Sequence, residues 1–125
     1  MAGKLAAVVQ DMFDALERND ADKTLTHFAS DTQGIDEISR VWMRGLDKLE
    51  GYIRGLVTQV SDVRSELKDI HEVVWGDAGV LTFWLEQDYT LEGERHHISA
   101  PSTTVLRQEK GQWKIVLFHS APLPE

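Results

Sequence analysis

His119 stands in the closing segment Trp113–Ser120 and is the side chain there that is best suited to acid–base chemistry. A histidine has an ordinary pKa near neutrality, so it can act as a general acid or base at physiological pH. The same imidazole could instead have a structural role, bonded to the backbone or to the Ser102 hydroxyl. The sequence therefore offers His119 either as a catalytic or ligand-contacting group or as a structural one.

Two other polar clusters could do chemistry. Asp69 and His71 are two residues apart on one face of an expected strand and could pair, although a solvated or ion-paired surface is the simpler interpretation. His96 and His97 are adjacent, so in a strand they point to opposite faces and are poorly placed to share a metal ion. The sequence also has no zinc spacing, Gly-rich phosphate loop or nucleophile elbow, so we expect no metal and no cofactor.

The composition narrows the possible partners. The chain has 125 residues, 42% of them hydrophobic, which predicts a single compact domain over residues 1–125. A net charge of −8 argues against nucleic acid and against an anionic membrane surface as partners. No apolar run approaches the roughly 20 residues of a membrane span. The chain has no cysteine, which is compatible with the cytoplasm, where we expect the protein to be.

The elements that must position these groups follow from hydrophobic periodicity. Apolar residues recur with helical spacing over 5–16 and 46–60, and a short helix is expected over Ala21–Ala29. Residues 35–44 are ambiguous and could form one or two short strands. Alternating patterns predict four strands over Val63–Trp75, Val80–Thr90, Arg95–Arg107 and Trp113–Ser120. Helices followed by a strand meander indicate an α+β fold, with the helices in the concave face of a strongly curved antiparallel sheet.

A pocket is predicted from the register of the last hairpin. If Lys110-Gly111 is a two-residue turn, Leu106 pairs with Ile115, Thr104 with Leu117, and Ser102 with His119. That face is apolar with a few small polar groups towards one end, as in pockets for small molecules. We therefore expect a small, largely apolar ligand to contact Ser102, Thr104, Trp113, Ile115 and Leu117, together with Tyr89 of the second long strand.

The other face of the hairpin carries Val105, Val116 and Phe118 in the same register. An exposed sheet face with such residues favours a protein partner, most simply a second copy of the chain. We therefore expect a homodimer formed through Val105, Val116 and Phe118.

Several local motifs resemble the SnoaL-like branch of the nuclear-transport-factor-2-like superfamily. They are Phe28-Ala29-Ser30-Asp31 at the end of the second helix, Gly45 before the third helix, the turn Trp75-Gly76-Asp77, and the closing hairpin Thr103-Thr104-Val105-Leu106 with Gly111-Gln112-Trp113-Lys114-Ile115-Val116 and His119-Ser120. The resemblance implies the cone-shaped α+β barrel shared with ketosteroid isomerase, scytalone dehydratase and polyketide cyclases.

The resemblance also implies a candidate base. Ketosteroid isomerases place a general-base Asp shortly after the Asp that ends the second helix, and counting from Asp31 leads to Asp36. In an apolar pocket the pKa of such a carboxyl group would rise, whereas in a loop it would simply be solvated. The isomerases also use a Tyr from the first helix and a second Asp from the third long strand. This chain has no Tyr before Tyr52 and no Asp between Arg95 and Arg107.

The resemblance thus implies an enzyme of the isomerase, cyclase or dehydratase kind. Asp36 would remove a proton next to a carbonyl group, and His119 would polarise the oxygen or return the proton. Related domains also serve as non-catalytic binding modules and as dimerisation modules, and both remain alternatives.

Overall fold

The computed structural model of the chain describes residues 3–123. The elements run in the order α1 Lys4–Glu17, α2 Ala21–Leu25, β1 Phe28–Ile35, β2 Met43–Arg44, α3 Leu46–Gln59, β3 Val60–Trp75, β4 Ala78–Leu91, β5 Glu94–Glu109 and β6 Gln112–Ser120. Among the described residues, no helix is both long enough and apolar enough to cross a membrane.

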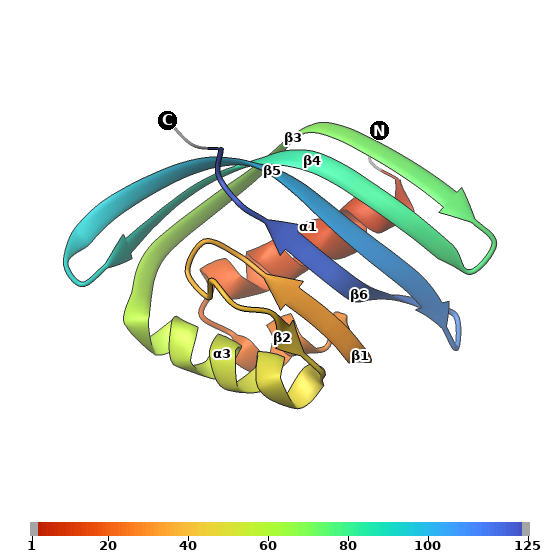
Figure 1. Cartoon of the computed structure of the whole chain (residues 1–125), viewed down its shortest axis with the longest axis horizontal. Coiled ribbons are helices and arrows are strands. Elements are labelled where there is room, and N and C mark those ends of the chain that lie inside the picture. Colours follow the sequence, from red (N-terminus) through yellow and green to blue (C-terminus); the bar gives the residue numbers. More distant parts are fainter. Residues whose placement is uncertain (1–2, 124–125) are drawn as a thin grey trace.

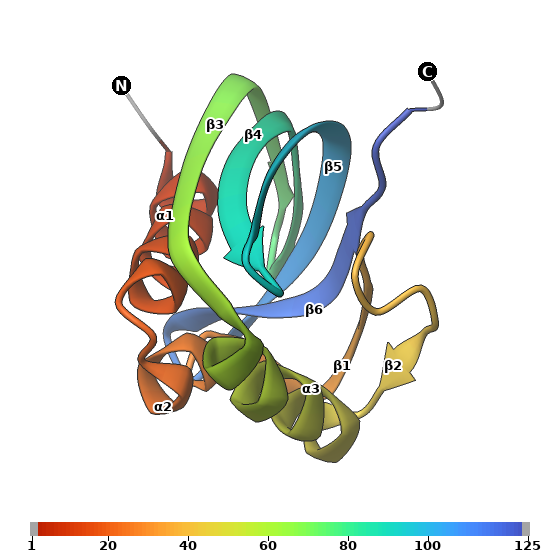
Figure 2. The same ribbon diagram turned by 90° about the vertical axis from the view of Figure 1, so that its left-hand side faces the viewer.

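All the strands belong to one sheet, in the order β2-β1-β6-β5-β4-β3. β1 runs parallel to β6, and the other neighbours are antiparallel. Strands β3 to β6 arch over α1, while α3 lies beneath the arch beside β1 and β2 (Figures 1 and 2). The predicted α+β class, with helices on the concave face, is confirmed. The sheet is mixed rather than wholly antiparallel, and it stays open instead of closing into a barrel.

The core lies between α1 and the concave face of the sheet. Leu5, Val9 and Phe13 recur on one stripe of α1 and are buried. The Phe13 ring packs edge-on against Phe83 at 6.4 Å and against Phe118 at 5.9 Å between ring centroids. α1 therefore packs against both β4 and β6 and covers one side of the concave face.

The predicted helix over Ala21–Ala29 ends four residues early, at Leu25. Phe28–Ile35, expected to begin inside that helix, is the strand β1, which pairs with β6 on one side and with β2 on the other. Its sequence lacks regular alternation, so the pairing of its backbone, and not its local pattern, decides the structure. The expectation that Phe28-Ala29-Ser30-Asp31 ends a helix is thus wrong.

The register of the β5–β6 hairpin changes part-way along. Lys110 and Gly111 have φ angles of 52° and 80°, as a two-residue turn of type I′ requires, and Leu106 pairs with Ile115 as predicted. A β-bulge follows, because the next pair joins Val105 to Leu117 and leaves Val116 as the extra residue. Beyond it Thr104 pairs with Phe118 and Ser102 with Ser120, so the predicted pairs Thr104–Leu117 and Ser102–His119 are wrong.

The bulge matters because side chains along a strand alternate between the two faces of the sheet. A shift of one residue exchanges the faces of everything beyond it. Phe118 and Ser120 therefore turn to the concave face, and Leu117 and His119 turn to the convex one.

Candidate functional site

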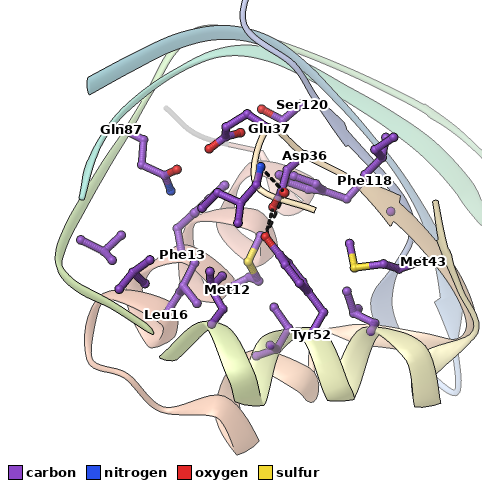
Figure 3. A pocket seen from close by; sticks show the side chains of 18 of the residues that line it. Met12, Phe13, Leu16, Asp36, Glu37, Met43, Tyr52, Gln87, Phe118 and Ser120 are labelled. Atoms are coloured by element: carbon purple, nitrogen blue, oxygen red, sulfur yellow. Dashed lines mark hydrogen bonds between the residues drawn. The ribbon is translucent and has the colours of Figure 1, made fainter. Parts of the chain in front are cut away.

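A cavity lies inside the arch, between the concave face of the sheet, α1, α3 and the segment that follows β1 (Figure 3). Its volume is about 60 Å³ when only the positions open to the centre of a water molecule are counted. A single water takes roughly 10–15 Å³ on that measure, so the space suits a few waters or a slender small molecule. Most of the wall is apolar, with side chains such as Met12, Phe13, Met43, Leu56, Leu85 and Phe118.

The polar groups of the cavity come from four separate parts of the fold. Asp36 and Glu37 follow the end of β1, Tyr52 comes from α3, Gln87 and Tyr89 from β4, and Ser120 from β6. Their convergence on one apolar space is the arrangement expected of a site that binds and orients a small molecule.

Asp36 is held by several hydrogen bonds. Its Oδ1 accepts from the backbone N–H groups of Ile38 at 3.0 Å and Ser39 at 2.8 Å, which fixes the turn after β1. The Tyr52 hydroxyl lies 2.9 Å from both carboxylate oxygens and donates a hydrogen bond that they share. Burial and the Asp36 charge both raise the pKa of Tyr52, which therefore remains a protonated donor.

Glu37 is the next residue and has a different environment. Burial, followed by the neighbouring Asp36 charge, raises the pKa of Glu37 from 4.5 to about 7. In Figure 3 its carboxyl group lies on the side of Asp36 away from Tyr52, towards Gln87. Near neutral pH this carboxyl group is thus poised between its acid and base forms.

Two β4 residues complete the polar end. Gln87 donates from Nε2 to the Ser65 hydroxyl at 3.0 Å, which fixes its amide. Tyr89 stacks on the His96 ring at 5.2 Å between centroids. Burial, Glu37 and Asp36, in that order, raise the pKa of Tyr89, so this hydroxyl also stays protonated at neutral pH.

The predicted site residues divide into two groups. Asp36 and Tyr89 line the cavity. Ser102, Thr104, Trp113, Ile115, Leu117 and His119 do not line it. The predicted pocket face failed because its pairing did not include the bulge at Val116.

His119 lies on the convex face and is exposed. Its ring sits 6.1 Å from that of Trp42, which is itself 40% exposed. The expectation that His119 reaches the same space as Asp36 is therefore wrong. Its neighbour Ser120 occupies that space instead.

The small polar residues predicted for the pocket are buried within the sheet. Ser102 donates to the Ser120 hydroxyl at 2.9 Å, and Thr104 donates to the Leu81 carbonyl at 3.2 Å. Ile115 is fully buried in the core. These residues have structural partners, so they support the cavity wall without facing the cavity.

Outside the cavity, His97 lies between two acidic side chains on the convex face. Its Nδ1 is 2.6 Å from Asp88 and its Nε2 is 3.6 Å from Glu86. His96 points to the opposite face, against Tyr89. Among residues 3–123, no group of three or more His, Cys, Asp or Glu side chains is arranged to hold a metal ion.

A family model for the SnoaL-like domain matches residues 5–124. The chain belongs to the SnoaL-like domain family. A search of curated protein sequences finds no significant match. Comparison with solved structures places this SnoaL-like domain among proteins described as NTF2-like, cystatin-like and ketosteroid isomerase-like.

Three of the similar solved structures align with nearly the whole of this chain. A candidate dehydratase of the NTF2-like family from Streptomyces avermitilis has a TM-score of 0.88 and 15% identity, and the alignment covers 98% of this chain and 96% of the dehydratase chain. A ketosteroid isomerase-like protein from Erwinia carotovora atroseptica has a TM-score of 0.82 and 17% identity, covering 98% and 95%. A candidate calcium/calmodulin-dependent protein kinase II association domain from Xanthomonas campestris has a TM-score of 0.85 and 20% identity, covering 97% and 86%. At these identities the likeness establishes the fold alone.

Tyr52 and Glu37 were not predicted from the sequence as site residues. Tyr52 had a signal, because it lies three residues after Leu49 and four before Leu56, on the buried stripe of α3. Glu37 had none, because it lies in an irregular turn whose side-chain directions do not follow from any periodicity.

Proposed function

We propose that this SnoaL-like domain binds a small, largely apolar carbonyl compound in the cavity and moves a proton on it. The reaction would be of the isomerase, cyclase or dehydratase kind. The observation that supports the proposal is the carboxylate pair Asp36–Glu37, which lies at the polar end of an otherwise apolar cavity.

The chemistry follows from the surroundings of that pair. A carboxylate works best as a base when its pKa approaches the working pH, because it then accepts a proton readily and can also return it. Burial and a like charge next to it are the usual means of raising such a pKa, and Glu37 has both. The Tyr89 hydroxyl supplies a hydrogen-bond donor within the same cavity.

The lining of the cavity also limits the class of compound that can bind there. Its wall offers aliphatic, aromatic and thioether surface, and none of the described lining residues is a Lys, Arg or His. An anionic ligand would find no counter-charge there and would meet the two carboxyl groups. A neutral, slender molecule with a single carbonyl oxygen fits the lining best.

The proposal can be tested with 5-nitrobenzisoxazole, a neutral ring that reports on a carboxylate base. The base removes the ring C–H proton, the electron pair forms a nitrile, and the N–O bond breaks to release a coloured phenolate. We expect the wild-type protein to accelerate this release at least about a hundredfold over the double variant Asp36→Asn/Glu37→Gln. Equal rates for the two proteins would refute acid–base chemistry by this pair.

A second role, dimerisation, is supported by the convex face. Val73, Val80, Val105 and Leu117 are successive cross-strand partners and form an aliphatic row across four strands. Val73 is 48% exposed and the nearby Trp75 is 62% exposed. We propose that a second copy of the chain covers this row. Of the three residues expected at the dimer interface, Val105 belongs to this row and Val116 lies at the edge of the row, in the bulge. Phe118 faces the cavity and is not part of the row.

The dimer can be tested by sedimentation velocity. Val105→Lys places a charge in the centre of the row and should convert a dimer to a monomer. Gln59→Lys, an exposed change on α3 far from the row in sequence and on another element, is the matched control and should leave the dimer intact. A wild-type protein that sediments as a monomer would contradict the proposal.

A further inference from the structure

The two carboxyl groups of the cavity differ in what already binds them. Asp36 accepts hydrogen bonds from two backbone N–H groups and from the Tyr52 hydroxyl, all at 3.0 Å or less. These bonds hold the turn after β1 and the Tyr52 ring in place. If Asp36 took a proton from a ligand, it would weaken several of these bonds at once.

The Glu37 carboxyl group has no comparable hydrogen bonds. Its side chain accepts no hydrogen bond from any other residue between 3 and 123, and only its own backbone N–H lies close. It lines the cavity, with the carboxyl group directed towards the space near Gln87. A carboxylate that is partly buried, free of protein donors and open to a cavity can approach a ligand atom without first breaking a bond.

We propose that Glu37 is the catalytic residue that carries the proton in this cavity, and that Asp36 is a positioning residue that fixes the turn, orients Tyr52 and supplies a neighbouring charge. This assignment rests on the proposed function and deepens it. It also departs from the base that the family resemblance implied, which was Asp36.

The proton transfer balances without a further reactant. The Glu37 carboxylate takes a proton from a carbon next to the carbonyl, and the electron pair moves towards the carbonyl oxygen to give an enolate. The Tyr89 hydroxyl donates a hydrogen bond to that oxygen. The Glu37 carboxylic acid then returns the same proton to another carbon of the conjugated system, which moves a double bond and leaves the composition of the substrate unchanged.

The charged and titratable groups that face Glu37 set its response to pH. They are Asp36 in the same turn, Tyr52 on α3 and Tyr89 on β4, with the neutral Gln87 and Ser120 beside them. Both tyrosines stay neutral at ordinary pH, so Asp36 is the only nearby charge among these groups. Removing it should lower the pKa of Glu37 towards its ordinary value, while burial still holds it higher.

The test compares single variants with 5-nitrobenzisoxazole as the substrate. Glu37→Gln should lower kcat/KM at least about a hundredfold, whereas Asp36→Asn should lower it by no more than about tenfold. In wild type the rate should rise with pH through a midpoint near 7, where Glu37 becomes its carboxylate. In Asp36→Asn that midpoint should move to lower pH, a change that a purely structural role for Asp36 would not produce.

Glu94→Gln, an exposed change of the same kind at the start of β5, is the matched control and should behave as wild type. If Asp36→Asn loses as much activity as Glu37→Gln or more, with its folding intact, the assignment to Glu37 is overturned while the proposed function stands. A wild-type rate equal to that of the double variant overturns both.

If Asp36→Asn fails to fold, the titration of wild type, compared with Glu37→Gln, decides the matter. Protein labelled with ¹³C at the glutamate carboxyl carbon should show one carboxyl signal that titrates near pH 7 and is missing from Glu37→Gln. A Glu37 signal that titrates at the ordinary glutamate value would overturn the assignment, whatever the activity.

Discussion

The concave and convex faces of the sheet both combine aliphatic and polar side chains, but they expose the polar ones to water to different degrees. On the concave side, burial raises the pKa of Glu37, Tyr52 and Tyr89. On the convex side, His71 and His119 are exposed at the two ends of one cross-strand row. The groups equipped for chemistry therefore lie on the side of the sheet that excludes water.

A single bulge assigns residues of β6 to these two faces. Before Val116, Ile115 pairs with Leu106 as predicted and is buried in the core, and after Val116 the order of the faces is inverted. Phe118 and Ser120 therefore contribute to the cavity, and Leu117 and His119 contribute to the opposite face. The distinction between the two faces can be tested by changes made on each of them.

The largest expected difference concerns catalysis. Glu37→Gln should reduce the turnover of 5-nitrobenzisoxazole at least about a hundredfold, while His119→Ala should change it by less than about threefold, because the imidazole lies outside the cavity. Initial rates of phenolate release at pH 8 measure both. A loss in His119→Ala as large as that in Glu37→Gln would show that the two faces share one site.

The second largest expected effect is the dependence on pH of the contribution that Glu37 makes to folding stability. Because folding raises the pKa of Glu37 from 4.5 to about 7, the folded state favours the protonated form. The stabilisation from this group is therefore complete below pH 4.5 and is lost as pH rises to about 7. The loss is at most roughly 3 kcal/mol, since water partly screens a carboxylate that is not fully buried.

Glu37→Gln cannot ionise, so it should be more stable than wild type at pH 8 and similar to it at pH 4. Urea unfolding at both pH values measures the difference. Glu94→Gln serves as the control and should show no such gain. A stability difference that does not vary with pH would mean that Glu37 is solvated on the outside of the cavity.

A smaller difference concerns packing across the bulge. Phe118 packs against Phe13 on the concave side, so Phe118→Ala should lower the free energy of unfolding by about 2–3 kcal/mol. Leu117→Ala, on the convex side of the same strand, should lower it by about 1 kcal/mol, because its side chain is only partly covered in the monomer. Urea unfolding at low protein concentration measures both. Equal losses would argue against the inverted register.

The smallest difference is expected between the two tyrosines of the cavity, Tyr52 and Tyr89. Tyr52→Phe removes the donor to both oxygens of Asp36 and should lower the free energy of unfolding by about 1–2 kcal/mol. Tyr89→Phe removes a cavity hydroxyl that is not bonded to Asp36, so it should change stability less. If the two variants are equally stable, the Tyr52–Asp36 bond does not position the turn.

Sequence patterns predicted the parts of this fold that depend on local rules. The stripes of α1 and α3 and the turn at Lys110-Gly111 follow from periodicity or turn chemistry, and Tyr89, expected at the pocket, lines the cavity. Asp36 came from the family resemblance, and it too reaches the cavity.

The remaining features depend on contacts between distant segments. β1 is a strand because its backbone pairs with β6, some eighty residues later in the chain, and its own residues carry no strand pattern. The bulge at Val116 has no marker such as Gly or Pro, yet it decides whether His119 or Ser120 enters the cavity. The orientation of Glu37 depends on the turn that Asp36 closes, so it could be found only from the structure.

The titration of Glu37 shows whether this carboxyl group can carry the proton at neutral pH. The measurement is the ¹³C chemical shift of the glutamate carboxyl carbons against pH, with Glu37→Gln identifying the signal of interest. We expect a midpoint near pH 7 in wild type and a lower midpoint in Asp36→Asn, because burial and the Asp36 charge together raise the pKa of Glu37. A wild-type midpoint near the ordinary value of 4.5, unchanged by Asp36→Asn, would contradict this role of Glu37.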